Sequence, residues 1–245
     1  MWIYETSLVA ASSFGNLEIM QLLLDKAAIV KSQRGGIIDS ALVAAGYSGK
    51  EEAVELLLAK GANMHAKVDG EWGSILIAAL SSYSANKEFV QFLIDKGADV
   101  NAEVGGDWGS AIVAVAMSKH KKEYTELVEL FLNNGADLNT VSMTRDYGYI
   151  SPLVAAVQRL AMARRTGRLY DSDDSEDSED SDDPHDQNLS SVRFLLERGA
   201  NVNLEVDGKW RNALQAAGKD EKNEDLRQLL YEYGAVDELM SDLDE

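Results

Sequence analysis

The sequence predicts an all-α repeat fold, a solenoid of about six helix-turn-helix units joined by β-hairpin fingers. Three observations support this prediction. A small polar residue precedes an apolar helix start at regular intervals, a second apolar stretch with helical spacing follows, and a glycine ends that second stretch. The shortest interval is 34 residues, and a period of about 33–34 residues is typical of stacked helical repeats.

The first helix of each unit is predicted to start after a residue that can cap it. These residues are Thr6, Ser40, Ser74, Ser110, Ser151 and Asn212, at intervals of 34, 34, 36, 41 and 61 residues. Insertions lengthen the later intervals. A side-chain oxygen directly before a helix accepts a hydrogen bond from the free N–H groups of its first turn. We therefore expect each of these residues to be an N-cap.

The second helix of each unit is predicted from apolar residues at i, i+3 and i+4, which share one helical face. The sets are Met20/Leu23/Leu24, Val54/Leu57/Leu58, Val90/Leu93/Ile94, Val128/Phe131/Leu132 and Val192/Leu195/Leu196. The glycines that end the helices are Gly61, Gly97, Gly135, Gly199 and Gly234. Glycine accepts the left-handed conformation of a helix C-cap. Ala27 takes this place in the first unit, where the strained φ would cost about 1 kcal/mol, so we expect a looser joint there.

The repeated letters resemble ankyrin repeats over essentially the whole chain outside one acidic insert. They include GADVN at 97–101, GANVN at 199–203 and a polar-x-Leu-x-x-Ala helix start. The resemblance implies the ankyrin solenoid. The usual Thr-Pro-Leu-His start is absent, and only Ser151-Pro152-Leu153 approaches it, which puts the turn hydrogen bonds of that Thr and His in doubt.

The fingers carry Gly-x-Trp-Gly-Ser-x-Leu, as at 70–76, which resembles the ankyrin arrays of filamentous fungi. Such arrays often lie at the C-terminus of larger signalling proteins with a nucleotide-binding switch domain. Residues 2–6 look like the end of a finger from an upstream repeat. We therefore expect the chain to be a fragment of a larger protein or the product of a truncated gene model.

The predicted domain organisation is a repeat array with one interruption. Residues 1–166 form about four and a half ankyrin units, 167–188 a disordered acidic insertion inside the fifth unit, 189–236 the remaining repeats and 237–245 an acidic tail. Ser172, Ser175, Ser178 and Ser181 recur every third residue among acids, which resembles substrates of casein-kinase-type enzymes. Phosphorylation of these serines is one interpretation, and a solvated acidic spacer is the other. Arg164, Arg165 and Arg168 lie beside the insertion and could pair with it.

The composition excludes several functional classes. The net charge is −19, which disfavours binding to nucleic acids and to anionic membranes. The chain has no cysteine, no apolar run of the roughly 18 residues that span a bilayer, and no basic n-region of a signal peptide. We expect an intracellular protein, cytoplasmic or nuclear or both.

No set of residues predicts catalysis, a metal site or a cofactor. The string Gly46–Lys50 suggests a phosphate loop, but Ala44 stands where its first glycine belongs and Glu51 where Ser or Thr is required. The three histidines, His65, His120 and His185, lack metal-ligand spacing. We therefore expect no enzyme and no cofactor.

The finger residues are the candidate protein-binding site. An aromatic residue stands two positions before most caps, and it either stacks between fingers, which we favour, or forms a row of binding hot spots. The aromatic residues are Tyr4, Trp72, Trp108, Tyr149 and Trp210. The resemblance implies binding through the fingertips and the concave helix face. The proposed binding residues are Asp69, Glu71, Trp72, Asp107, Trp108, Arg145, Asp146, Asp207, Lys209 and Trp210.

The sequence thus predicts a noncatalytic protein-interaction module or scaffold. Because the fingertips are mostly acidic, the expected partner is a protein with a basic patch. The alternative is a substrate-selecting or regulatory arm of a larger enzyme, possibly one with a nucleotide switch. We expect a monomer unless the N-terminal face is unpaired.

Overall fold

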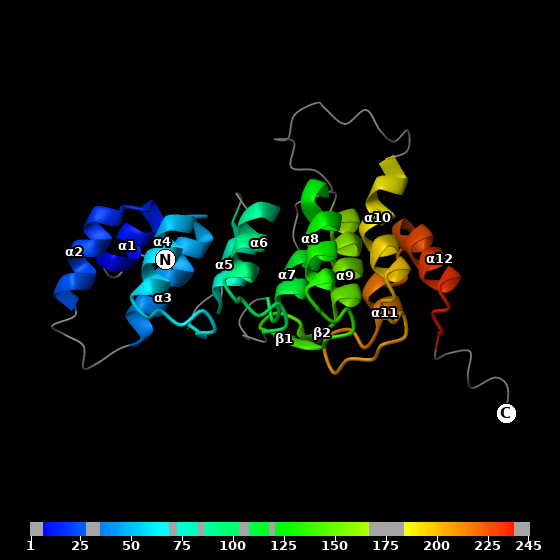
Figure 1. The fold of residues 1–245 in the computed structure, drawn as a ribbon. Helices are drawn as coiled ribbons and strands as arrows, with labels where there is room; N and C mark the ends of the chain where they lie inside the picture. Colours follow the sequence, from blue (N-terminus) through cyan, green and yellow to red (C-terminus); the bar gives the residue numbers. More distant parts are fainter. Residues whose placement is uncertain are drawn as a thin grey trace. The chain divides into compact units, whose positions relative to one another are not determined.

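The computed structural model describes residues 7–27, 35–68, 73–82, 86–102, 108–117, 121–166 and 184–237. Twelve α-helices in these ranges form six consecutive pairs, as the sequence predicts (Figure 1). The chain divides into two compact units, residues 1–136 and 137–245. None of the helices in the described ranges is long and apolar enough to cross a bilayer.

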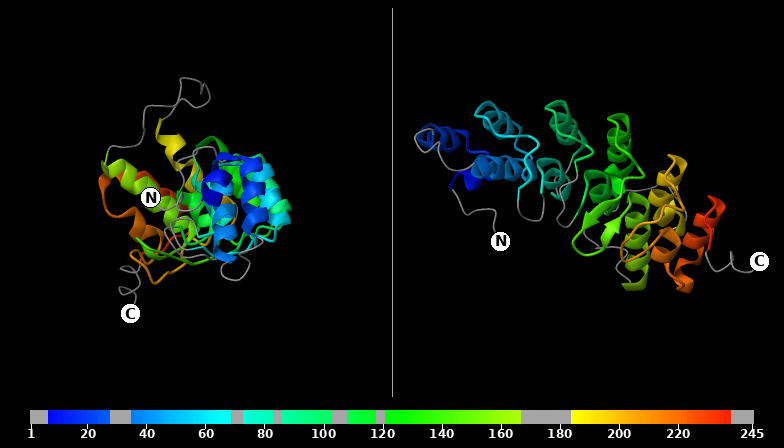
Figure 2. Two further views of the ribbon diagram at one scale, coloured as in Figure 1. Left: turned by 90° about the vertical axis from the view of Figure 1, so that its left-hand side faces the viewer. Right: turned by 90° about the horizontal axis from the view of Figure 1, so that it is seen from below.

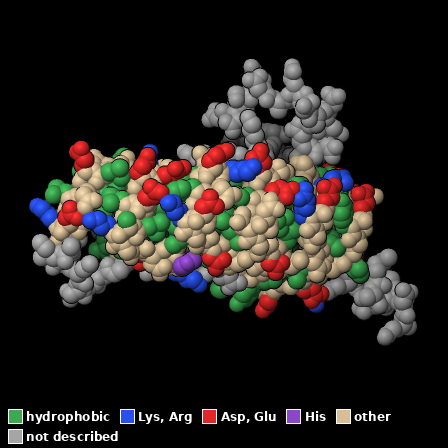
Figure 3. Space-filling view, viewed as in Figure 1, with side chains coloured by type: hydrophobic (Ala, Val, Ile, Leu, Met, Phe, Trp, Pro, Cys, Tyr) green, Lys and Arg blue, Asp and Glu red, His purple; other side chains and the backbone are tan. Residues whose placement is uncertain are grey.

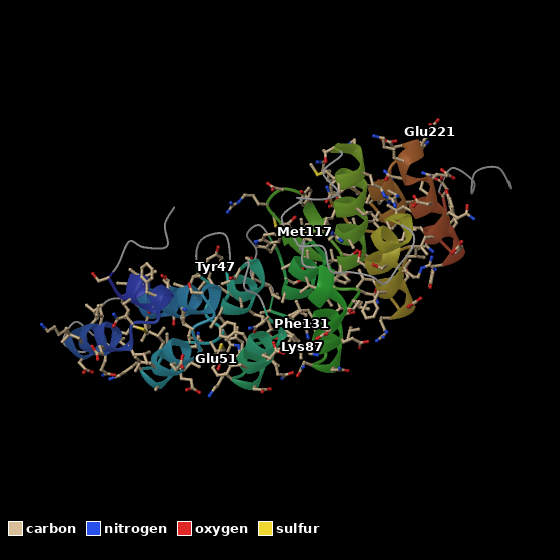
Figure 4. All side chains as sticks on the ribbon, turned by 90° about the horizontal axis from the view of Figure 1, so that it is seen from above. Tyr47, Glu51, Lys87, Met117, Phe131 and Glu221 are labelled. Atoms are coloured by element: carbon tan, nitrogen blue, oxygen red, sulfur yellow. The ribbon has the colours of Figure 1, made fainter. Side chains whose placement is uncertain are left out.

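The first unit contains four helix pairs. They are α1 (Ser7–Phe14) with α2 (Leu17–Ala27), α3 (Gly35–Tyr47) with α4 (Glu51–Ala59), α5 (Ile75–Ser81) with α6 (Lys87–Asp95), and α7 (Ala111–Met117) with α8 (Lys121–Asn133). The first helices stack in the order α1, α3, α5 and α7, and second helices contact one another beside them. Figure 4 shows Tyr47 and Met117 on the row of first helices, and Glu51, Lys87 and Phe131 on the row of second helices.

The second unit contains two helix pairs and a hairpin. Its elements are β1 (Ser142–Thr144), β2 (Gly148–Ile150), α9 (Pro152–Thr166), α10 (Pro184–Glu197), α11 (Ala213–Ala217), the 3-10 helix η2 (Glu221–Asn223) and α12 (Glu224–Glu232). The strands are antiparallel, and Met143 faces Tyr149 in the register. Helix α9 packs against both α10 and α11. Two further views of these elements are given in Figure 2.

The core of each unit combines small and large residues of the first helices with large residues of the second helices. Ala45, Ala78 and Ala155 are fully buried on first helices. The i and i+3 positions of α4, α6, α8 and α10 are also fully buried, namely Val54/Leu57, Val90/Leu93, Val128/Phe131 and Val192/Leu195. Each such side chain contributes about 1.5–3 kcal/mol on burial. The i+4 residues Leu58, Ile94 and Leu132 are only half-buried, because they lie at the rim of the buried stripe.

Three of the predicted N-caps are confirmed. The side chains of Ser74, Ser151 and Asn212 accept hydrogen bonds from the N–H groups of Ile77, Val154 and Gln215 at 3.3, 3.3 and 3.0 Å. These bonds satisfy donors that the first turn leaves free.

The predicted caps at Ser40 and Ser110 are wrong. Helix α3 already begins at Gly35, so Ser40 lies inside it and its Oγ donates to the Gly36 carbonyl at 2.6 Å. Ser110 precedes α7, but its buried Oγ has no hydrogen-bond partner in the part of the chain that the structure describes. Thr6 lies outside the described residues.

The predicted glycine C-caps are confirmed. Gly61, Gly97, Gly135, Gly199 and Gly234 have φ values of 91°, 97°, 82°, 92° and 85°. After Gly97, the Ala98 N–H donates to the Leu93 carbonyl at 2.9 Å, which closes the helix end. The strain expected at Ala27 is absent, because Ala27 is the last residue of α2 and no non-glycine residue in the described ranges has positive φ.

Arg164 has a different partner from the one that its position in the sequence suggests. Its side chain is 5% exposed. It donates through Nη2 to Asp225 Oδ2 at 2.8 Å and through Nη1 to the Lys222 carbonyl at 3.0 Å. Arg164 therefore joins α9 to the start of α12. Arg168 and the four candidate phosphorylation serines lie outside the described residues, and α10 begins at Pro184, before the expected helix start near Leu189.

Candidate protein-interaction surface

The two fingers of the second unit contact each other through their backbones. One finger is the β1–β2 hairpin, and the other is residues 205–211, where the Val206 N–H donates to the Arg211 carbonyl at 2.8 Å. Gly148 and Gly208 form a bridge between the fingers, and the Lys209 N–H donates to the Tyr147 carbonyl at 2.9 Å. A Cβ atom on Gly208 would lie 2.0 Å from the Tyr149 carbonyl oxygen. Position 208 therefore requires glycine.

An aromatic contact reinforces this pair of fingers. The rings of Tyr147 and Trp210 have centroids 5.3 Å apart, and the Lys209 ammonium lies 4.8 Å from the Trp210 centroid and 5.6 Å from that of Tyr147. Cation–π contacts of this kind contribute about 0.5–1 kcal/mol at exposed sites. Trp210 thus packs between the fingers against Tyr147, which is not among the predicted site residues. The nearby Asp-Tyr-Gly-Tyr string was the available signal, since two tyrosines flank the glycine that makes the close approach.

The outer face of the hairpin exposes an apolar pair. Met143 is 61% exposed and Tyr149 is 45% exposed, and the two residues are paired across the strands. Ser142, Thr144 and Ile150 point the other way and are buried. Tyr149 therefore lies at the surface and not in the stack. Met143 is not among the site residues predicted from the sequence. Side chains alternate between the two faces of a strand, and this alternation could have placed Met143 on the outer face.

Exposed charged residues lie on the same two fingers as this pair. Arg145 and Asp146 form the exposed hairpin turn, and Asp207 and Lys209 are exposed on the neighbouring finger. Of the predicted site residues, these four and the half-buried Trp210 belong to one pair of adjoining fingers. The surface combines an apolar centre with charges of both signs.

The fingers of the first unit are described only in part. Asp69, Glu71, Trp72 and Asp107 lie outside the described residues, as does Tyr4. Trp108 is half-buried, and its carbonyl accepts the Ser110 N–H at 2.9 Å.

The first helices offer little side-chain surface in the middle of the first unit. Residues 75–80 of α5 and 111–116 of α7 are all buried. Exposed side chains on the first helices of the second unit are Met162, Arg165 and Thr166 on α9 and Gln215 on α11. The fingers therefore present more side-chain chemistry than these helix faces do.

The phosphate-loop-like string is a helix–helix turn. Gly46 and Tyr47 end α3, Ser48 and Gly49 form the turn, and α4 begins at Glu51 (Figure 4). The Lys50 N–H donates to the Ala45 carbonyl at 3.0 Å, so the backbone of this turn is used within the fold. No group of three or more metal-ligating side chains occurs within the described ranges.

Comparisons with known proteins agree with this architecture. The family model of ankyrin repeats (3 copies) matches residues 42–142. The human ASB11 ankyrin repeat domain is 22% identical, with 95% of this chain and 85% of that chain covered and a TM-score of 0.54. The ankyrin repeat domain of Bcl-3, a member of the IkappaB protein family, is 25% identical, with coverages of 95% and 88% and a TM-score of 0.60. The search of curated protein sequences gives no match.

Proposed function

We propose that this chain, whose residues 42–142 match the family model of ankyrin repeats, is a noncatalytic binding module whose second-unit fingers recognise a partner protein. Ankyrin repeats are general protein–protein interaction modules. In this chain we assign recognition to the two fingers of the second unit. Asp69, Glu71, Trp72, Asp107 and Trp108 stay further candidates from the sequence, and the first four lie outside the described residues.

The observation that carries the proposal is the exposed Met143–Tyr149 pair on a braced hairpin. Both side chains have more than a third of their surface exposed although the opposite face of the hairpin is buried. Exposed apolar side chains inside a charged rim resemble the centre of a protein interface. Because the fingers are held together by the Gly148–Gly208 bridge, little conformational entropy remains to be lost on binding.

The charges suggest what the partner offers. Asp146 and Asp207 are exposed beside the apolar pair, and the whole chain carries a net charge of −19. Opposite charge on a partner would speed association and select its orientation. We therefore propose a partner with an apolar knob or groove bordered by basic side chains. Arg145 and Lys209 would meet acids at the edge of that surface.

The test is affinity capture from the source organism with the full chain and its Met143→Ser/Tyr149→Ser variant. Both residues are exposed, so circular dichroism and the unfolding midpoint should match the wild type. The proposal predicts that a specific partner is retained by the wild type and lost by the variant. Tyr233→Ser is the matched control, because Tyr233 is also exposed in the second unit but lies after α12. Equal retention by all three proteins would contradict the finger proposal.

A further inference from the structure

The first unit carries an open groove between its second helices α2 and α4. The groove has a volume of about 640 Å³ and lies within one compact unit. Its apolar residues are Leu17 and Leu22 of α2 and Leu56 of α4. Leu22 is 57% exposed, which is unusual for a leucine beside another helix of the same fold. In Figure 3, hydrophobic side chains lie at the surface beside acidic ones over α2 and α4.

In the next pair of second helices, α4 and α6, charged residues occupy positions that correspond to groove residues of α2. Glu51 of α4 occupies the place of Leu17, and Glu55 occupies the place of Gln21. Lys96 then binds Glu55 at 2.6 Å and lies 5.2 Å from the centre of the Phe92 ring. The junction of α4 and α6 is therefore covered by its own side chains.

Between α2 and α4, the equivalent side-chain contacts cover only one end of the groove. Lys60 binds Asp25 at 2.9 Å, and Gln21 donates to the same carboxylate at 2.6 Å. This network lies at the end of α2, because Asp25 is close to its last residue. The half of the groove lined by Leu17, Leu22 and Leu56 remains open.

Two carboxylates flank the open half. Glu18 of α2 and Glu52 of α4 line the groove and are exposed. Neither has an ion-pair partner in the part of the chain that the structure describes, whereas Asp25 in the covered half has Lys60. A ligand that brings positive charge to both sides of an apolar stripe would pair these carboxylates.

We propose that the α2–α4 groove binds the apolar face of a basic amphipathic helix from a partner protein. An amphipathic helix inserts residues at i, i+3, i+4 and i+7 into such grooves. Leucine-like side chains of the partner would contact Leu17, Leu22 and Leu56. Lysine or arginine residues beside them would reach Glu18 and Glu52. This surface is made by second helices and is separate from the fingers.

The test measures binding of a fluorescently labelled peptide to the full chain by anisotropy. The peptide is an amphipathic helix with leucines at i, i+3, i+4 and i+7 and lysines beside them, and a second peptide has glutamates in place of the lysines. The lysine peptide should bind, and Leu22→Ser and Glu18→Lys/Glu52→Lys should each weaken its binding about tenfold or more. The glutamate peptide should bind much more weakly.

A charge-matched control separates the groove from the general acidity of the protein. Glu88→Lys/Glu197→Lys changes the net charge equally, and Glu88 has the place of Glu52 on the next second helix, α6. This control should retain wild-type binding. Equal weakening by the control, equal binding of both peptides, or no binding would each overturn the proposal. Sedimentation velocity tests whether the groove binds a second copy of this chain. Self-association of the wild type that Leu22→Ser abolishes would overturn the proposal of a partner helix.

Discussion

The first and last helix pairs of this protein are stabilised in different ways. In the first pair, Ile19 of α2 is 47% exposed, while its equivalents on the next three second helices, Ala53, Phe89 and Leu127, are buried. Ile19 therefore exposes apolar surface at a position where α4, α6 and α8 bury theirs.

The last pair, α11–α12, is fastened by polar side chains. The Asn223 side chain donates to the Ala217 carbonyl at 2.8 Å, Arg227 donates to the Gly218 carbonyl at 3.0 Å, and Arg164 of α9 holds Asp225. On the finger side, the Asn203 side chain donates to the Gly234 carbonyl at 2.8 Å and accepts the Val236 N–H at 2.9 Å.

The difference illustrates how stability is distributed in a repeat fold. Each repeat is stabilised by its own contacts and by those with its neighbours. The last pair adds a network of polar contacts to its apolar core, whereas the first pair leaves apolar side chains at its surface.

A large effect is expected from breaking the polar contact of the last pair. Asp225→Ala should destabilise the full chain by about 3 kcal/mol, because it leaves the buried Arg164 guanidinium without its carboxylate. Urea unfolding followed by circular dichroism measures this loss. Glu224→Ala is the control, since the exposed Glu224 carboxylate lies 3.9 Å from Arg227 and should contribute little. Similar midpoints for both variants would show that the network does not hold α12.

Truncating Leu127 and its equivalent Ile19 compares how much a buried and an exposed side chain at the same repeat position contribute to stability. Leu127→Ala should cost about 2–5 kcal/mol because Leu127 is buried. Ile19→Ala, at the same place in α2, should cost less than about 1 kcal/mol because much of its surface already faces solvent. The same unfolding experiment compares both variants. Equal losses would mean that the surface of Ile19 is covered in solution.

A smaller effect is expected where the two fingers of the second unit meet. Gly208→Ala places a methyl group against the Tyr149 carbonyl, and relieving this overlap should cost about 1–3 kcal/mol. Hydrogen exchange should show lost protection of the Lys209 N–H, which donates across the finger contact. Gly36→Ala is the control, because its new Cβ would meet nothing within 4 Å. Unchanged exchange at Lys209 would contradict the close approach.

The smallest effect concerns the pH dependence of stability at Asp25. Hydrogen bonds from Gln21 and then Lys60 hold the pKa of Asp25 below its usual value. A lowered folded-state pKa means that this stabilisation is present above the unfolded pKa and is lost as pH falls through the folded pKa. The midpoint difference between wild type and Asp25→Asn should therefore be largest near neutral pH and vanish in acid. A difference that grows on acidification would have the wrong sign.

Local features of this fold could be predicted from the sequence because they depend on neighbouring residues. The glycine C-caps and the caps at Ser74, Ser151 and Asn212 require only the residues of one helix end. Ser40 failed as a cap because α3 extends back to Gly35, where the Gly-Gly-Ile-Ile string gave no clear start signal. The prediction was therefore wrong about where α3 begins and not about its being a helix.

Long-range contacts could not be predicted in the same way. Arg164 and Asp225 are separated by 61 residues, and the acidic insertion beside Arg164 suggested a nearer partner. The stacking of Trp210 on Tyr147 depends on how closely Gly148 and Gly208 approach, which no single finger reveals. The exposed Met143 became a site residue only when the strand register paired it with Tyr149.

Hydrogen exchange of the full chain with and without its captured partner tests the central functional claim most directly. The finger proposal predicts that binding slows exchange in β1, β2 and residues 205–211. Met143→Ser/Tyr149→Ser should abolish that protection while leaving the exchange of α9 and α12 in the free protein unchanged. Protection that leaves both of these fingers unaffected would contradict the claim and place recognition on another surface.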